Sequence, residues 1–245
     1  MSESRSNYTP RPMSNATTYA LGGVAVSLIV LIVIAAFQWG RDDVAVRNDG
    51  YGSVRDTEVR AVLEQDGSIL LGRPEPKKTI TIFEDPLCPG CGNLERIYGQ
   101  EIAEQIDTGA LAVRYRLVNF LDDRSKSKDY STRAVAASRC VAEAGSGPVY
   151  SRFHTDLFTT KRPSEGGADL NNTELAALAR TAGAGEPVMQ CIETGAEVDA
   201  ARTTATAQTT ALGDALGGSA ATPSVFDGTT KVDVGDENWV AALTE

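Results

Sequence analysis

Two cysteines separated by two residues carry the clearest chemistry in this chain, in the run CPGC at positions 88–91. Such a pair can exchange disulfides with other thiols, bind zinc or form an inert structural disulfide. A zinc site would need a second close pair of ligands, but Cys140 and Cys191 lie far apart and His154 is the only histidine. The pattern therefore favours a redox pair, with zinc binding and an inert disulfide as the alternatives.

The motif lies between a predicted strand at 78–84 and a predicted helix. Cys88 would then be the N-cap of that helix, where unpaired N–H groups and the helix dipole favour a thiolate. Pro89 suits the first helical turn because its missing N–H is not needed there. Cys91, one turn further on, would face the first sulfur from the buried side. We therefore predict that Cys88 attacks and that Cys91 resolves the mixed disulfide.

A second signal is Thr222-Pro223, which precedes a predicted strand late in the chain. Proline is unusual at the start of a central strand, and a cis peptide bond would explain it. An ordinary trans proline on an edge strand is the alternative. Taken together with the upstream cysteine motif, the position favours the cis interpretation.

The elements that must position these residues follow from the hydrophobic patterns. Strands are predicted by alternation and β-branched residues, and helices by apolar residues at helical spacing. The stretch 200–222 is rich in Ala, Thr and Gly and reads as a small-residue helix or as a solvated linker. A helix between two strands implies a parallel pair, so we expect an α/β fold with a mixed sheet. The predicted strands are 68–72, 78–84, 111–120, 222–227 and 230–234, and the predicted helices are 94–106, 131–145, 148–160, 172–183, 187–194, 197–212 and 237–243.

An apolar segment near the N-terminus predicts a membrane helix at 19–39, after a short cytoplasmic tail at 1–18. A cleaved signal peptide and a buried core helix are the alternatives. A polar stalk is predicted at 40–60, followed by the folded domain at 61–245. A membrane anchor or a signal peptide would place that domain outside the cytoplasm, where disulfides persist. The net charge of −10 argues against nucleic acid as a partner.

The segment TIFEDPLCPGCGNLE at 81–95 resembles the active-site segment of DsbA-like thioredoxin-fold proteins, particularly the membrane-anchored actinobacterial type. The resemblance covers roughly 65–245 and implies a thioredoxin fold with a mixed central sheet and an inserted α-helical subdomain at about 125–205. It also implies that Cys88 is the nucleophile, Cys91 the resolving thiol, and Thr222-Pro223 the cis-proline loop that binds substrate.

Two departures from this family are visible. The buried acid that many relatives carry six residues before the first cysteine is replaced by Ile82, and Glu84 and Asp85 are out of register with that position. The dipeptide within the motif is Pro-Gly, whereas the best-known strong oxidants of the family have Pro-His. The missing histidine removes one donor to the thiolate.

The remaining cysteines, Cys140 and Cys191, each share a helical face with apolar residues. The residues alone leave open a disulfide or two buried free thiols. The resemblance implies a structural disulfide between them. His154 lies on the apolar face of its helix and is interpreted as a core residue, not as a catalytic one.

The resemblance implies an extracytoplasmic thiol:disulfide oxidoreductase that oxidises the free thiols of exported proteins. Its electrons would pass to a DsbB-like or VKOR-like (vitamin-K-epoxide-reductase-like) membrane oxidoreductase. We expect a monomer in the cell membrane, anchored by a single pass, with no cofactor and no metal. The alternatives are an exported reductase or isomerase, and a non-catalytic module that binds a metal or a client protein through its thiols.

Overall fold

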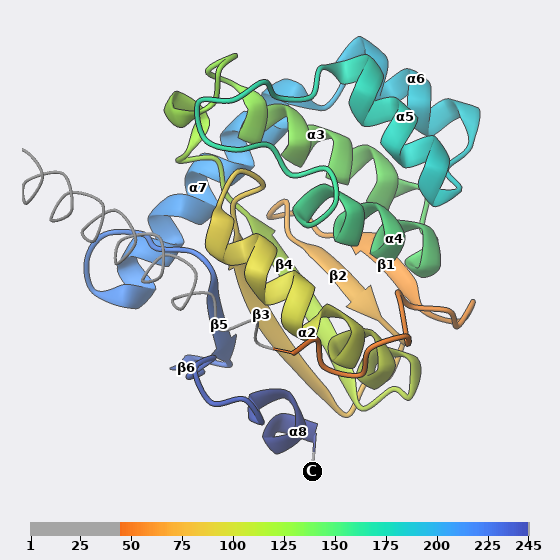
Figure 1. Cartoon of the computed structure of the whole chain (residues 1–245), viewed down its shortest axis with the longest axis vertical. Helices are drawn as coiled ribbons and strands as arrows, with labels where there is room; N and C mark the ends of the chain where they lie inside the picture. Colours follow the sequence, from red (N-terminus) through yellow and green to blue (C-terminus); the bar gives the residue numbers. More distant parts are fainter. Residues whose placement is uncertain (1–44, 245) are drawn as a thin grey trace, which may run out of the picture. The chain divides into compact units, whose positions relative to one another are not determined.

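The computed structural model describes residues 45–244, in which strands and helices alternate along the chain (Figure 1). The predicted tail 1–18 and the predicted membrane helix 19–39 lie outside these residues. Within 45–244, no helix combines the length and apolar character needed to cross a membrane. The strands are β1 (Arg60–Leu63), β2 (Ile69–Gly72), β3 (Lys78–Glu84), β4 (Leu111–Leu117), β5 (Ser224–Asp227) and β6 (Thr230–Lys231), and the helices are α2 (Pro89–Asp107), α3 (Tyr130–Glu143), α4 (Gly147–Phe158), α5 (Asn172–Ala182), α6 (Glu186–Thr194), α7 (Val198–Leu216) and α8 (Trp239–Thr244).

The strands of the described residues form one mixed sheet in the order β1-β2-β4-β3-β5-β6. β3 and β4 are parallel because α2 connects them as a crossover helix, and all other neighbours are antiparallel. At the centre of the sheet, Ile82 pairs with Tyr115 on one side and with Val225 on the other. The mixed sheet predicted from the sequence is confirmed, and its central strand leads directly into the cysteine motif.

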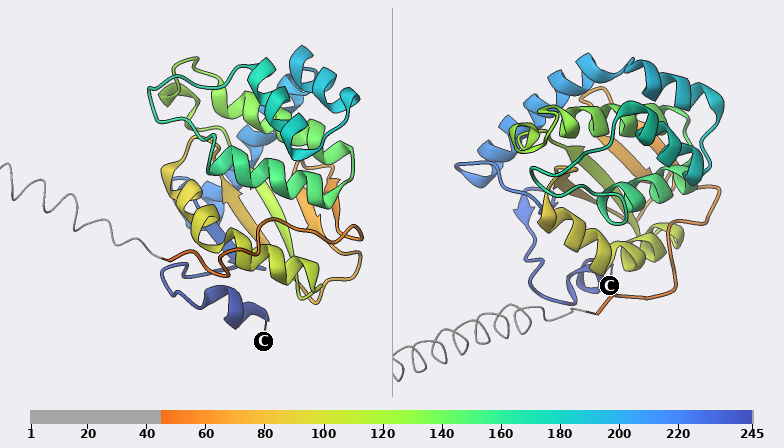
Figure 2. Two further views of the ribbon diagram at one scale, coloured as in Figure 1. Left: turned by 45° about the vertical axis from the view of Figure 1, so that its right-hand side comes forward. Right: turned by 45° about the horizontal axis from the view of Figure 1, so that its top comes forward.

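Side chains alternate across β3, and the two faces of the sheet are covered differently. Ile80, Ile82 and Glu84 share one face and are fully buried. On the opposite face Phe83 packs edge-to-face on Phe226, with the ring centroids 5.8 Å apart, next to Leu212 of α7. The views agree that α2 and α4 cover the first face and that α7 lies behind the sheet (Figures 1 and 2). The cysteine motif therefore begins on the face under α2.

The helical region inserted between β4 and β5 contains α3 to α7 and the short turn before α3. It is confirmed as a helical insertion, but it extends to Leu216, beyond the predicted limit near 205. The Thr-rich stretch is helical, and its threonine hydroxyls are satisfied within the helix by carbonyls one turn earlier, as Thr209 is by Ala205 at 2.9 Å. Ala201 and Ala205 are fully buried, so the small residues allow α7 to pack closely on its neighbours.

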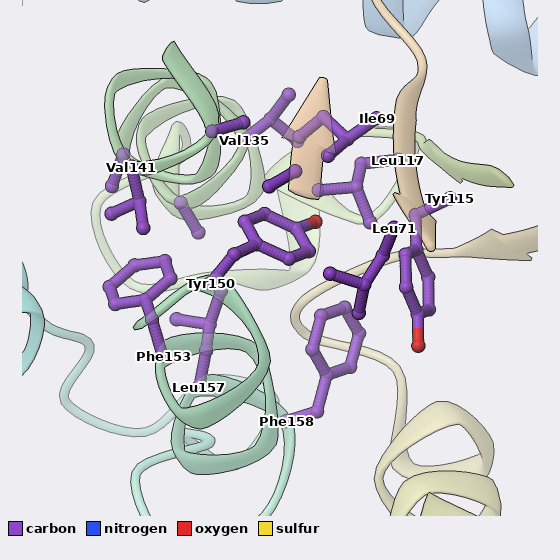
Figure 3. Packing of buried hydrophobic residues seen from close by; sticks show 14 of the residues in the cluster. Ile69, Leu71, Tyr115, Leu117, Val135, Val141, Tyr150, Phe153, Leu157 and Phe158 are labelled. Atoms are coloured by element: carbon purple, nitrogen blue, oxygen red, sulfur yellow. The ribbon is translucent and has the colours of Figure 1, made fainter. Parts of the chain in front are cut away.

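The main core lies between the first face of the sheet and the helices (Figure 3). α4, whose N-terminus is capped by the Ser146 hydroxyl, contributes a run of large apolar side chains. These side chains meet Leu71 and Tyr115 from the strands and Val135 from α3. The contributing residues of α4 are Tyr150, Phe153, Leu157 and Phe158, all of them inaccessible to solvent.

The segment before β1 differs from the prediction. The sequence predicts a free polar stalk over 40–60, but from residue 45 the chain packs on the domain. Val54 and Val59 are buried in the main core, and the backbone N–H of Val54 donates to Ser151 Oγ at 3.1 Å. Asp107 at the end of α2 accepts hydrogen bonds from this segment, including one from the Tyr51 hydroxyl at 2.7 Å. The segment has few apolar residues, and polar residues separate them, so its pattern does not predict these long-range contacts. For the same reason β1 was not predicted.

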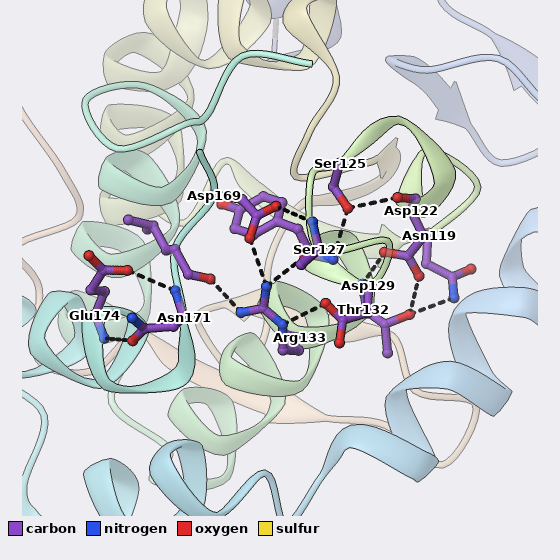
Figure 4. Close-up of polar contacts among 12 residues, drawn as sticks. Asn119, Asp122, Ser125, Ser127, Asp129, Thr132, Arg133, Asp169, Asn171 and Glu174 are labelled. Atoms are coloured by element: carbon purple, nitrogen blue, oxygen red, sulfur yellow. Dashed lines mark hydrogen bonds and ion pairs between the residues drawn. The ribbon is translucent and has the colours of Figure 1, made fainter. Parts of the chain in front are cut away.

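A polar network ties the loop after β4 to the start of α3 (Figure 4). Arg133 is paired with Asp129 and with Asp169, each at 2.9 Å, and it also donates to Ser127 at 2.9 Å. Asp169 is almost fully buried, so an ionised partner is needed to offset its desolvation. The guanidinium thus holds the segments before α3 and before α5 together.

A disulfide joins Cys140 of α3 to Cys191 of α6, which lie 51 positions apart in sequence. It is the pairing that the family resemblance implies. Because the closed loop is long, the bond restricts the unfolded chain strongly. It therefore fastens α6 to α3 within the helical insertion.

We expect a Cys140→Ala/Cys191→Ala double variant to lose about 4 kcal/mol of unfolding free energy, the loop-closure value for a loop of this length. Urea unfolding followed by circular dichroism measures this difference. A double variant that unfolds at the same urea concentration as the wild type would contradict the prediction.

Candidate active site

The cysteine motif occupies the junction between β3 and α2. Cys88 is the N-cap residue of α2 and Pro89 is its first residue, so the helix begins inside the motif. The sulfur-bearing side chains differ in exposure, because Cys88 is 7% exposed and Cys91 is not exposed at all. Both are free thiols in this structure. One sulfur therefore lies at the surface end of the helix and the other behind it.

Asp85 organises the turn that leads into the motif. Its carboxylate accepts hydrogen bonds from the N–H groups of Leu87 and Leu121, at 2.9 and 3.0 Å, and from Ser131 Oγ at 2.6 Å. Its backbone oxygen accepts from the Cys88 N–H at 2.9 Å. Burial raises the pKa of Asp85 to about 7, although these hydrogen bonds oppose the shift. This role of Asp85 could not be predicted from the sequence, because it depends on partners far away in the chain.

The thiol of Cys88 has its pKa lowered from 9.0 to about 5. A hydrogen bond with Cys91 is the largest cause, and Thr222 and the backbone N–H groups of Gly90 and Cys91 add to it, while burial opposes the shift. Those N–H groups are the unpaired donors of the first helical turn. Cys88 is therefore a thiolate at neutral pH, which is the form that attacks disulfides.

The thiol of Cys91 behaves in the opposite way. Burial raises its pKa well above the ordinary value, and the negative charges of Cys88 and Glu84 raise it further. Cys91 is therefore protonated at neutral pH in the reduced protein. This arrangement gives one ready nucleophile and one buried thiol that must lose a proton before it can react.

The Thr222-Pro223 peptide bond is cis and lies against the motif. In its thiol form Cys88 donates to the Thr222 carbonyl oxygen at 3.3 Å. The Thr222 hydroxyl is buried without a partner among the described residues, so it is free to donate to the thiolate. A Cβ atom at Gly90 would lie 2.9 Å from Pro223 Cδ, so the glycine allows the loop to approach the helix closely.

A group of three buried ionisable side chains lies behind the cysteines; we call Glu84, Glu95 and His154 the buried acid–base cluster. His154 Nε2 is 3.2 Å from Glu84 Oε2 and 3.4 Å from Glu95 Oε1. The imidazole also lies between two aromatic rings that are tilted relative to it, with centroids 4.2 Å from Tyr115 and 4.5 Å from Phe158. His154 is thus buried, as its helix pattern indicates, but it faces two carboxylates instead of apolar neighbours alone.

Two members of the cluster, Glu84 and His154, have shifted pKa values. Burial is the largest cause that raises the pKa of Glu84, and the neighbouring Glu95 charge raises it further. Burial alone would lower the pKa of His154, but the two carboxylates more than offset that and raise it. Glu84, Glu95 and His154 each offer one atom that could bind a metal, and these atoms lie within 4.8 Å of one another. Among the described residues, these three side chains form the group that could hold a metal ion.

Sequence reasoning missed this cluster because it judged Glu84 by its distance from Cys88 along the chain. Two signals point to it. Glu84 shares a face of β3 with Ile80 and Ile82, since side chains alternate along a strand. Glu95 follows Cys91 by four residues and therefore lies on the same face of α2.

The four cysteines do not form a zinc site. Cys140 and Cys191 are bonded to each other, which leaves Cys88 and Cys91 as the two thiols of the motif. Two sulfur ligands fall short of the four ligands of a structural zinc site.

Comparison with known proteins gives a consistent result. A family model described as Thioredoxin matches residues 64–245. The structure is similar to the MdbA protein, a thiol-disulfide oxidoreductase from Corynebacterium diphtheriae, with a TM-score of 0.68 and 27% identity over 78% of this chain and 96% of that one. It is also similar to oxidised DsbA from Mycobacterium tuberculosis, with a TM-score of 0.57 and 32% identity over 74% of this chain and 92% of that one.

One sequence relative is named as a protein kinase. The chain is 43% identical over 178 residues to serine/threonine-protein kinase PknE of Mycobacterium tuberculosis. That match covers 71% of this chain but 31% of the kinase. Kinase activity is therefore not assigned to this chain.

We expect the Cys88 thiolate to appear with a midpoint near pH 5 when the reduced protein is titrated, and to disappear below it. In a Cys91→Ala variant the midpoint should rise towards the ordinary value, because the largest stabilising hydrogen bond is lost. Ultraviolet absorbance of the thiolate measures both titrations, with Cys88→Ala as the blank. An unchanged midpoint in Cys91→Ala would contradict the assigned cause.

Proposed function

The chain belongs to the thioredoxin family, among its DsbA-like thiol–disulfide oxidoreductases, and from this premise we propose that it oxidises the thiols of exported proteins. Cys88 is proposed as the sulfur that contacts the client and Cys91 as the resolving thiol. The observation that carries the proposal is the pair of opposite pKa shifts at the start of α2. A stabilised thiolate favours the reduced form of the protein and so makes its disulfide a stronger oxidant.

The exchange proceeds in two steps with balanced electrons. A client thiolate attacks Cys88 Sγ, the Cys88–Cys91 bond breaks, and its electron pair goes to Cys91 Sγ. A second client thiolate then attacks the client sulfur of the mixed disulfide, and Cys88 leaves as a thiolate. The client has lost two electrons and gained a disulfide, and the Cys88–Cys91 pair has gained the two electrons.

The client is proposed to lie in extended form beside Pro223. A hollow of about 330 Å³ opens there, lined by Pro223, Val225, Val232 and Asp233 among others. It borders β5, whose neighbour β6 is two residues long. Backbone pairing in such a place depends little on side chains, which suits an enzyme with many clients.

The reduced pair must be reoxidised, and a DsbB-like or VKOR-like membrane oxidoreductase is the proposed acceptor of its electrons. We further propose that the domain works outside the cytoplasm, held at the membrane by the apolar segment at 19–39. The Cys140–Cys191 disulfide supports this location, since structural disulfides persist in oxidising compartments.

The second candidate function is that of a reductase with the same fold. One residue of the cysteine motif favours this function. Gly90 has no side chain, so the thiolate has fewer donors than in relatives with histidine at that position. The direction of electron flow therefore depends on how far the remaining donors stabilise Cys88.

The reduction potential of the Cys88–Cys91 pair in the purified chain, equilibrated with glutathione, tests the direction. We expect a value nearer to about −120 mV than to about −270 mV, because a stabilised thiolate makes the disulfide oxidising. A value near about −270 mV would overturn the oxidase and support the reductase. A Cys88→Ala variant should be inactive in oxidising a reduced client, and full activity in that variant would refute the site.

A further inference from the structure

The buried acid–base cluster brings together three side chains that are costly to bury. The side chains of Glu84, Glu95 and His154 are 0%, 3% and 3% exposed. Ionised groups in such a place destabilise the fold unless opposite charges and hydrogen bonds offset their loss of water. Both Glu84 carboxylate oxygens, Glu95 Oε1 and both ring nitrogens of His154 lack a hydrogen bond of good geometry among the described residues. Their electron pairs are therefore available to a cation.

The charges of the cluster suit a divalent cation better than a proton. With a neutral imidazole, the carboxylates of Glu84 and Glu95 carry two negative charges. A proton on His154 offsets one of them and leaves the other buried, whereas a divalent ion offsets both. The charge of Cys88, which also acts on Glu84, is negative as well. Electroneutrality thus favours a doubly charged ion at this place.

The spacing of the ligand atoms fits a small ion with tetrahedral coordination. His154 Nε2 is 3.2 Å from Glu84 Oε2 and 3.4 Å from Glu95 Oε1. Zinc bonds of about 2.0–2.1 Å at tetrahedral angles place neighbouring ligand atoms about 3.3–3.4 Å apart. The potential ligand atoms of all three side chains lie within 4.8 Å of one another. One imidazole and two carboxylates are also ligands that zinc accepts.

A small cavity beside the cluster has room for a fourth ligand. It measures about 10 Å³, close to the size needed for one water molecule, and Glu95 and His154 both line it. The polar residues Ser151 and Thr155 line it as well, which suits a water molecule. Three protein ligands and one water molecule would complete a tetrahedral set.

An entry path leads to the cluster from the surface. Glu95 and Thr155 line both the small cavity and an open groove of about 640 Å³ between the segment 46–53, α2 and the end of α4. An ion in the groove therefore meets the Glu95 carboxylate first. A path of this kind is required of any metal site that fills after folding.

We propose that Glu84, Glu95 and His154 bind one Zn²⁺ ion, with a water molecule in the adjoining cavity as its fourth ligand. The ion joins β3, α2 and α4, from which the three ligands come. It fastens the helical insertion to the strand and the helix that carry the cysteine motif. This inference goes beyond the proposed function and does not depend on the direction of electron flow.

The site is separate from the sulfur chemistry. Cys91 is not a member of the group whose ligand atoms lie within 4.8 Å of one another. The ion therefore leaves both sulfurs of the motif available for disulfide exchange. Calcium and magnesium fit the cluster less well, because they require six or more ligands that are mostly oxygen atoms.

The test is zinc binding by the purified full chain with the Cys88–Cys91 disulfide formed, so that the motif has no thiols to bind the ion. The chain is equilibrated with zinc sulfate and desalted, and its zinc is measured by plasma mass spectrometry. We expect one zinc ion per chain. Cobalt(II) in the same site should show the visible absorption bands of tetrahedral coordination without a thiolate charge-transfer band.

Glu84→Gln and Glu95→Gln should each weaken zinc binding by more than about 100-fold, since loss of an outer-shell partner alone costs about 10- to 100-fold. Each variant keeps one carboxylate to pair with His154, and circular dichroism verifies that it folds. The matched control is Glu101→Gln, a buried glutamate of α2 that is paired with Arg47 at 3.4 Å outside the cluster. This control should bind zinc like the wild type.

Thermal unfolding gives a second measurement. Zinc should raise the unfolding temperature of the wild type and of Glu101→Gln relative to the same chains in EDTA, because an ion that binds the folded state stabilises it. It should not raise the unfolding temperature of Glu84→Gln or Glu95→Gln.

Three results would overturn the site. The first is an oxidised wild-type chain that retains no zinc, and the second is equal zinc binding in the wild type, Glu84→Gln and Glu95→Gln. The third is zinc that binds only after reduction and is lost in a Cys88→Ala/Cys91→Ala double variant, because the motif thiols would then be the ligands. The proposed oxidase is tested separately, by the reduction potential, and stands if the zinc site fails.

Discussion

The stabilisation of a thiolate at the N-terminus of α2 is the interaction on which the site depends. The first turn of a helix has N–H groups without partners, and Cys88 is placed where these groups can bond its sulfur. The same helix carries Cys91 into the core, where burial favours the thiol. One helix start therefore creates two sulfurs of opposite character. The sheet, the Asp85 turn and the Thr222-Pro223 loop keep this helix start in place.

The sequence predicts the features that arise from local rules. The pattern of β3, the proline in the first turn of α2 and the periodicity of the helical insertion all act within a few residues, so their elements are correct to within a few positions. The mixed sheet follows from the crossover helix between β3 and β4. The position of the cysteine motif at a strand-to-helix junction could therefore be foreseen without coordinates.

Features that depend on distant partners could not be foreseen. Asp85 becomes the organiser of its turn only because Ser131 and Leu121 come from after β4. The segment before β1 has few apolar residues, and its packing depends on Val54 and Val59 reaching the core next to α4. His154 has the pattern of a core residue, and only the arrival of α2 and β3 beside it adds the two carboxylates. Composition and periodicity do not show which residues from distant parts of the chain come into contact.

Glu84 lies two residues closer to Cys88 than the buried acid that many relatives carry. The sequence places Ile82, not an acid, six residues before Cys88, and Ile82 lies at the centre of the sheet between Tyr115 and Val225. A shift of one residue would turn an acid to the opposite face, under α7, but a shift of two keeps it on the face under α2. Two residues also move it about 7 Å along the strand, towards the end where the cysteines lie. The acid at 84 is therefore buried under α2, at the end of β3 that leads into the cysteine motif.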